Sequence, residues 1–234
     1  MNTTEQLKSL RDETGVSVMQ CKKALDEAGG DIEKARIILK KKSGDAAAKK
    51  ADRELGAGII VTAQNTDRAV MLTLLCETDF VAKNEDFVNA AKSLAGIALA
   101  GGKSALDNSA EEVNALIQKM GENVKIGDVV VAESTNAAVY NHNGQYASVV
   151  VLKDKNDTLA RDIAMHATAM RPAYLVETDI AAEAQEKAKE IFGKEVEEQS
   201  AGKPEEMKVK ILEGETSLHQ RPIENYRTAS QGIK

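Results

Sequence analysis

The sequence predicts an α+β protein, and three features of the 234-residue chain indicate this class. Helical patterns with clear start and stop signals fill its first part. Apolar, strand-like hairpins followed by helical patterns then occur twice. The chain is 42% hydrophobic but only 3% aromatic, without Trp, so its cores must be aliphatic. We expect a three-helix module and two α+β subdomains in which antiparallel sheets are flanked by helices.

The predicted boundaries divide the chain into four parts. Residues 1–44 form a helical docking module and residues 45–55 a helical linker rich in alanine and lysine. Residues 56–136 form the first α+β subdomain and residues 137–234 the second. A three-helix module of this size has a modest core that is marginal alone, so its expected role is docking.

Capping signals define the helices of the module. Ser17 with Gln20 forms a capping box, and Asp31 is a favoured N-cap for the third helix. Gly15 and the Gly29-Gly30 pair end the helices before them. We expect Lys40, Lys41 and Lys42 at the C-terminal end of the third helix, where the helix dipole favours cations. The apolar positions at helical spacing are Leu7, Leu10, Val18, Cys21, Leu25, Ile32, Ala35, Ile38 and Leu39.

The first subdomain is predicted to begin with a hairpin. Its strands, Ile59–Ala63 and Ala69–Leu75, flank the turn residues Asn65-Thr66-Asp67. Two helices and a strand, Ile126–Ala132, follow. The first helix carries an apolar stripe, and the second begins at a capping box and ends at a glycine. The stripe is Phe87, Ala91, Leu94 and Ala98, the box is Ser109 with Glu112, and the glycine is Gly121.

The second subdomain is predicted from another hairpin and two helices. Its strands contain Val139-Tyr140 and Tyr146–Leu152, around the turn Asn141–Gly144. A helix over Thr158–Met170 ends before Pro172, and a charged helix covers roughly residues 180–200. His166 shares an apolar face of the first of these helices with Ile163, Ala167 and Met170, so we expect it in the core.

Composition and charge exclude several classes of protein. Residues 1–53 hold 12 basic and 9 acidic residues, whereas residues 54–234 hold 19 basic and 28 acidic residues. The acidic body argues against nucleic acid as the main partner, because phosphate neutralisation dominates such binding. Cys21 and Cys76 lie far apart, which fits a reducing compartment rather than a disulfide framework. No apolar run approaches the ~18 residues of a membrane span, so we expect a cytoplasmic protein without membrane contact.

No motif indicates a catalytic, metal or nucleotide site. The segment Gly96–Ser104 resembles a phosphate-binding loop, but it is one residue too long and follows a predicted helix end, where carbonyl groups lie. We interpret it as a helix stop. His142, His166 and His219 lack partners at metal-ligand spacing. The sequence therefore favours a binding protein without cofactor, metal or bound nucleotide over an enzyme.

The strand end at Cys76 leads into a corner that carries one of only three phenylalanines, Phe80. Thr78 and Asp79 are both favoured N-caps, which would place Phe80 at the start of a helix, facing outward to a partner. Alternatively, a helix that begins one turn earlier places Phe80 and Phe87 on one heptad-spaced core stripe. The spacing supports both interpretations equally.

Several segments together resemble the translation elongation factor Ts family. The resemblance is strongest in the module and at the corner, and it covers roughly residues 4–213. After Pro204 the chain departs from the family pattern and its tail is shortened, which leaves the completion of the second sheet open. The matching segments are Leu10–Gly15, Met19–Leu25, Gly30–Ala35, Thr78–Asn84, Ile163–His166 and Gly202–Pro204.

The resemblance implies a guanine nucleotide exchange factor for GDP-bound elongation factor Tu, with a module like a ubiquitin-associated domain. The module would dock on the GTPase domain of Tu, and the corner would wedge between Tu helices and disturb the Mg²⁺ site. His142, at the turn of the second hairpin, would lie toward another domain of Tu. The implied contacts are Arg11, Val18 and Met19 in the module and Thr78, Asp79, Phe80 and Val81 at the corner.

Two alternative functions remain open at this point. The chain could bind or chaperone a GTPase without promoting exchange, or it could be an enzyme whose site the sequence does not reveal. The host compartment, bacterial cytoplasm or organelle, and the oligomeric state are also open.

Overall fold

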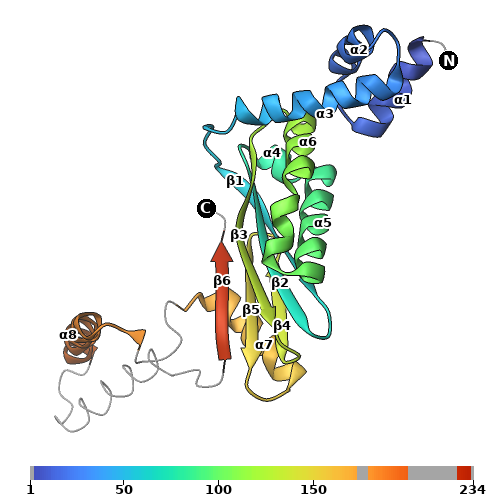
Figure 1. Ribbon diagram of the computed structural model, residues 1–234. Coiled ribbons are helices and arrows are strands. Elements are labelled where there is room, and N and C mark those ends of the chain that lie inside the picture. Colours follow the sequence, from blue (N-terminus) through green and yellow to red (C-terminus); the bar gives the residue numbers. More distant parts are fainter. Residues whose placement is uncertain (1–2, 173–178, 200–225, 233–234) are drawn as a thin grey trace.

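The computed structural model describes residues 3–172, 179–199 and 226–232, and its helices and antiparallel sheets confirm the α+β class. Helices α1–α3 stand at one end, and two sheets extend away from them (Figure 1). The helices are α1 (Thr3–Thr14), α2 (Val18–Glu27), α3 (Ile32–Ala48), α4 (Asp79–Ala82), α5 (Glu85–Gly101), the 3-10 helix η1 (Lys103–Asn108), α6 (Ala110–Met120), α7 (Asp157–Met170) and α8 (Ala182–Gln199). The strands are β1 (Ala57–Gln64), β2 (Arg68–Cys76), β3 (Val124–Glu133), β4 (Ala137–His142), β5 (Tyr146–Leu152) and β6 (Tyr226–Gly232).

Helices α1–α3 enclose a small aliphatic core of their own, built around Leu10, Cys21 and Leu39. The predicted caps are confirmed, because Ser17 accepts a hydrogen bond from Gln20 N and Asp31 accepts from two backbone amides. The predicted end of the third helix is wrong. Ala46, Ala47 and Ala48 are strong helix formers, and α3 continues past Gly44 and Asp45 to Ala48. The lysines therefore lie in its middle.

The two sheets pack face to face between layers of helices. The first has the order β1-β2-β3 and the second β4-β5-β6, and all neighbours are antiparallel. Alternate residues of β2 point to opposite faces: Leu72 and Leu74 pack with α5 and α6, whereas Met71 packs against the second sheet. β5 alternates likewise, with Val149 toward the first sheet and Val150 toward α7.

The β4–β5 turn is attached to the edge of β1, which fixes how the two sheets sit together. Ile60 N donates to Gly144 O at 2.7 Å, and Asn141 Nδ2 donates to Ile60 O at 2.8 Å. Gly144 has φ +73°, and a Cβ atom there would lie 2.7 Å from Ile59 Cγ1. Only glycine meets both demands without strain.

Several predicted elements are confirmed and others are corrected. Gly121 ends α6 in the left-handed conformation, and the helix stop at the end of α5 is present. Ser109 precedes α6 but makes no capping hydrogen bond, and it is buried. β6, which the sequence did not indicate, pairs with β5 and completes the second sheet. The family match Gly202–Pro204 and the tail segment 213–223 lie outside the described residues.

The two phenylalanines of the first subdomain should respond differently to truncation. Phe87 is fully buried, so Phe87→Ala should lower the free energy of unfolding by about 3–5 kcal/mol. Phe80 is 82% exposed, so Phe80→Ala should change it by no more than about 0.5 kcal/mol. Urea unfolding followed by circular dichroism measures both changes, and equal losses would contradict this assignment of the core.

Candidate functional site

The chain turns sharply after β2 because two helix caps follow each other closely. Thr78, in an extended conformation, caps α4, and its Oγ1 accepts a hydrogen bond from Val81 N at 3.4 Å. Asn84 then caps α5 and accepts from Asp86 N at 2.9 Å. The four-residue α4 is therefore a projecting corner, held at both ends. The predicted Thr78 cap is confirmed.

Phe80 points outward from this corner. Its 82% exposure is the highest among the large hydrophobic side chains that the structure describes as exposed. Its neighbours Val81 and Ala82 face inward and pack against the core of the first sheet. Phe87 and Leu94 are buried without Phe80, so the core interpretation of Phe80 is wrong.

Two carboxylates brace the corner from beneath. Glu122, in the loop between α6 and β3, accepts from Thr78 N at 3.0 Å and from Thr78 Oγ1 at 2.7 Å. Glu77 accepts from Asn123 N at 2.6 Å and pairs with Arg53 at 3.3 Å. The Asn123 amide hydrogen bond holds the pKa of Glu77 below its ordinary value, so this brace stays anionic. The corner and the α6–β3 loop thus hold each other in place.

The charges at the corner are also ordered. Lys83 Nζ lies 2.7 Å from Asp79 Oδ2, and this hydrogen bond lowers the pKa of Asp79, so its carboxylate stays ionised. Beneath the corner, Cys76 Sγ donates to Thr78 O at 3.2 Å. Burial, with a smaller contribution from the charge of Glu122, raises the pKa of Cys76 to about 11, so at neutral pH the thiol keeps its proton.

The predicted contact residues of the helical module are all exposed. Arg11 lies in the last turn of α1, and Val18 and Met19, in the first turn of α2, are 44% and 64% exposed. The module is attached to α6 through a Gln118–Gln20 hydrogen bond of 3.2 Å and a Lys40–Glu111 ion pair of 2.7 Å.

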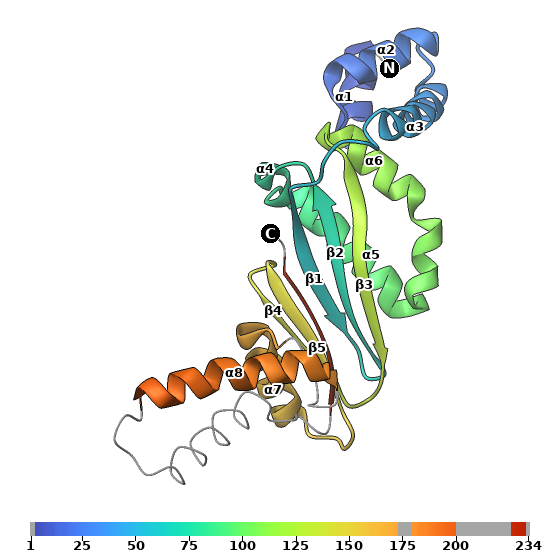
Figure 2. The same cartoon turned by 90° about the vertical axis from the view of Figure 1, so that its left-hand side faces the viewer.

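His142 is exposed at the end of β4, and its Nδ1 lies 3.2 Å from the Tyr140 hydroxyl. A groove of about 570 Å³ separates α4 from the β4–β5 turn; Asp79 and Lys83 line one wall, and Asn143 and Gly144 line the other. Figure 2 shows α1, α2, α4 and the β4–β5 turn along the same side of the molecule.

The predicted burial of one histidine is wrong, and the structure adds residues that the sequence did not indicate. His166 is exposed, because Ala164 and Ala167 make the buried face of α7 instead. Glu122 and Asn123 hold the corner through Thr78 and Glu77. The one signal in the sequence for this role is their position directly after Gly121, which ends α6.

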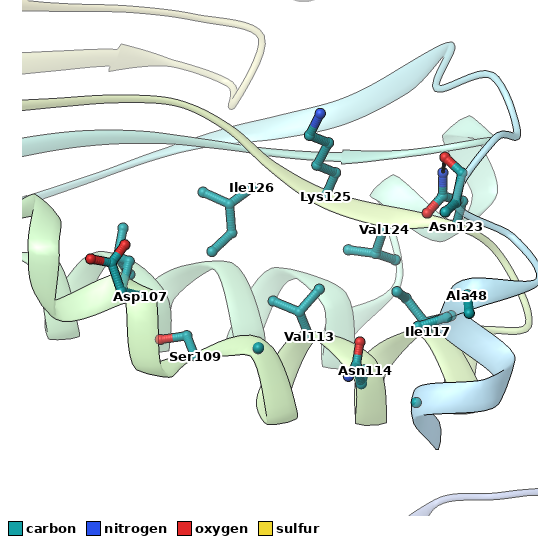
Figure 3. Close-up of a pocket in the computed structure, with 15 residues that line it drawn as sticks. Ala48, Asp107, Ser109, Val113, Asn114, Ile117, Asn123, Val124, Lys125 and Ile126 are labelled. Carbon is teal, nitrogen blue, oxygen red and sulfur yellow. Dashed lines mark hydrogen bonds between the residues drawn. The ribbon is translucent and has the colours of Figure 1, made fainter. Parts of the chain in front are cut away.

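A larger groove, of about 640 Å³, lies between α6, β3 and the end of α3 (Figure 3). Its walls are mainly aliphatic, including Val113, Ile117 and Ile126. Lys125 points away from α6, and Asn123 Nδ2 is occupied by the carbonyl groups of residues 51 and 53. The groove is therefore mainly an apolar surface.

Among the described residues, no group of three His, Cys, Asp or Glu side chains could hold a metal ion. No helix in the same part of the chain has the length and apolar character needed to cross a bilayer.

Comparison with known proteins shows the family. The family model described as "Elongation factor TS" matches residues 77–221, which include the corner. This chain belongs to the elongation factor Ts family. The relative named elongation factor Ts from Psychrobacter arcticus is 36% identical over 223 residues, which are 91% of this chain and 75% of the relative.

Other members of the elongation factor Ts family match at similar levels. The protein from Xanthomonas euvesicatoria is 37% identical over an alignment that covers 99% of this chain and 87% of the relative. The protein from Marinobacter nauticus is 37% identical over an alignment that covers 94% of this chain and 81% of the relative. The family likeness therefore extends across the helical module, the corner and the second sheet.

Removal of the cap should loosen the corner. Thr78→Ala loses the bond to Val81 N and one of the two bonds to Glu122, so the free energy of unfolding should fall by about 1–2 kcal/mol. Thr78→Ser keeps the hydroxyl and should lose much less. Urea unfolding and hydrogen exchange at the Val81 amide measure both effects, and equal losses in the two variants would contradict the capping role.

The raised pKa of Cys76 predicts slow reaction with thiol reagents. In the folded protein, alkylation of Cys76 should reach half its maximal rate near pH 11, against about 9 in urea. Between these values the unfolded chain releases a proton that the folded chain keeps, so stability should fall as pH rises. Peptide mass spectrometry measures the alkylation. A native midpoint near pH 9 would show that the thiol is not shielded.

Proposed function

We propose that this chain is a guanine nucleotide exchange factor that binds GDP-bound elongation factor Tu and promotes release of GDP. The observation that carries the proposal is the outward Phe80, held by the Thr78 cap and the Glu122 brace. A rigidly presented ring can enter a neighbouring protein without first losing conformational freedom, which lowers the cost of binding.

The proposed mechanism acts on the Mg²⁺ ion of the partner. Phe80 enters between helices of the GTPase domain, with Thr78, Asp79 and Val81 beside it, and displaces the groups that hold Mg²⁺. The metal neutralises much of the charge on the GDP phosphates, so its loss weakens nucleotide binding. No covalent bond is made, and this chain contributes binding groups rather than catalytic ones. It needs no cofactor or nucleotide of its own.

The energetics require more than one contact. The factor and the nucleotide must each lower the other's affinity by the same ratio. A shift from 1:99 to 99:1 needs about 5.5 kcal/mol of differential binding, whereas one buried phenylalanine supplies about 1.5–3 kcal/mol. Further contacts come from exposed residues elsewhere in the chain. They are Arg11, Val18 and Met19 on the module and His142 on the second sheet.

The setting follows from the proposed partner. The relatives come from bacteria, and elongation factor Tu acts in translation, so we place this chain in a cytoplasm of bacterial type. The acidic body is poorly suited to binding nucleic acid, because such binding depends on neutralising phosphate charge.

Phe80→Ala should keep the fold and most of the affinity for elongation factor Tu but slow exchange. Loss of about 1.5–3 kcal/mol at the wedge corresponds to a rate about ten- to a hundredfold lower. Release of fluorescent GDP from Tu, started by catalytic amounts of this chain, measures the rate. Leu159→Ala is the matched control, because Leu159 is also exposed but lies on α7, away from the corner.

The same assay separates the proposal from its alternative. Acceleration of GDP release by the wild-type chain supports exchange, whereas tight binding without acceleration would identify a partner that holds Tu without exchange. Equal rates for Phe80→Ala and the wild type would remove Phe80 from the mechanism.

A further inference from the structure

We propose that a pocket between α7 and the β4–β5 hairpin binds an acidic side chain of the partner protein, as a second anchor beside the corner. This inference rests on the proposed function, since it assigns the contact that the second sheet makes with the same partner. The pocket has a volume of about 380 Å³, and its polar or aromatic groups are Tyr140, His142, Tyr146, Thr168 and Arg171.

The pocket gathers residue types that are scarce in this chain. Two of the four tyrosines and one of the three histidines line it, together with an arginine and Met165. Tyrosine, arginine and methionine are enriched at protein interfaces, and tyrosine and arginine dominate their binding energy. Among the described residues, no carboxylate lines the pocket. A cationic, aromatic pocket in an acidic body is suited to an anion.

The side chains are arranged so that their donors face one space. Tyr140 and His142 alternate along β4 and therefore share a face, and Tyr146 lies opposite His142 on β5. The Tyr140 hydroxyl and His142 Nδ1 are 3.2 Å apart. When the hydroxyl donates to Nδ1, the imidazole carries its proton on Nε2 and offers it to a ligand.

Arg171 lies over the Tyr146 ring, with its Cζ 4.9 Å from the ring centroid. A guanidinium group can stack on a ring through its flat face. The N–H groups along its edge have the geometry to donate two parallel hydrogen bonds to a carboxylate.

The backbone at Arg171 gives independent support. Arg171 ends α7 in the left-handed conformation, with φ 47° and ψ 57°, where glycine or asparagine is normally favoured. Among the described residues, only Arg171 and Asn143 have positive φ without being glycine. A bulky residue kept at a strained position is typical of a functional site.

The pocket and the corner groove meet at the tip of the β4–β5 hairpin, although they share no lining residue. Asn143 and Gly144 of the β4–β5 turn line the groove beside Asp79, and His142, which precedes them, lines the pocket. A partner that receives Phe80 and covers this groove meets the hairpin tip, one residue from His142. This proximity favours an acidic side chain of that protein over a free small anion.

The test compares full-length variants at Arg171 for affinity to GDP-bound elongation factor Tu, by titration calorimetry at low and high salt. Arg171→Gly removes the cation and relaxes the backbone, so it should keep or raise the melting temperature while weakening binding about tenfold. Its affinity should depend less on salt. Arg171→Lys keeps the charge and should lose less, whereas Arg171→Glu should lose more than Arg171→Gly because it repels an acid.

Each outcome decides a different point. Unchanged affinity of Arg171→Gly, with Phe80→Ala still slow in exchange, would overturn the pocket alone. Equal losses in Arg171→Gly and Arg171→Glu would show that the bound group is not an anion. Failure of the wild-type chain to bind Tu would overturn the proposed function and the pocket with it. If Arg171→Gly lowers the melting temperature, the affinity of Tyr140→Phe for GDP-bound elongation factor Tu is the deciding measurement. Binding about threefold weaker than that of the wild type supports the pocket, and unchanged affinity overturns it.

Discussion

The two hydrogen bonds from Thr78 to the carboxylate of Glu122 are the constraint on which the corner depends. A four-residue helix has almost no stability of its own, because nucleation costs more than so few bonds return. Glu122 and the capping bond to Val81 N replace that missing stability with tertiary contacts. Their result is that Phe80, which would gain by burial in its own core, stays in water and available to a partner.

The same strategy repeats at the second exposed site. The β4–β5 turn would be mobile if it stood alone, but Gly144 O and Asn141 bind the backbone of Ile60. Packing of the two sheets through alternating residues then fixes the distance between this turn and α4. Two loops from different sheets thus behave as parts of one surface. A partner can contact both at once, and binding carries no entropy cost for ordering either loop.

The division between core and surface explains why the chain is rich in small aliphatic residues and poor in aromatic ones. Phe87 is the one phenylalanine in the core of the first sheet, where alanines of α5 allow the helix to lie close to β1 and β2. The exposed Phe80 stands at the corner, and Tyr140 and Tyr146 line the pocket, where the proposed recognition uses them. These three rings thus lie where the molecule meets its proposed partner.

The sequence by itself determined most of the secondary structure, because caps and stops such as Thr78 and Gly121 act through residues only a few positions away. The sequence did not determine burial where the local pattern allowed two answers. His166 lies among apolar residues at helical spacing but is exposed, and the spacing around Phe80 suited core and surface equally. Only the tertiary structure decided that Phe80 faces outward and that Glu122 supports its corner. That contact joins residues 44 positions apart, and neither helical periodicity nor a local motif records a pairing across such a distance.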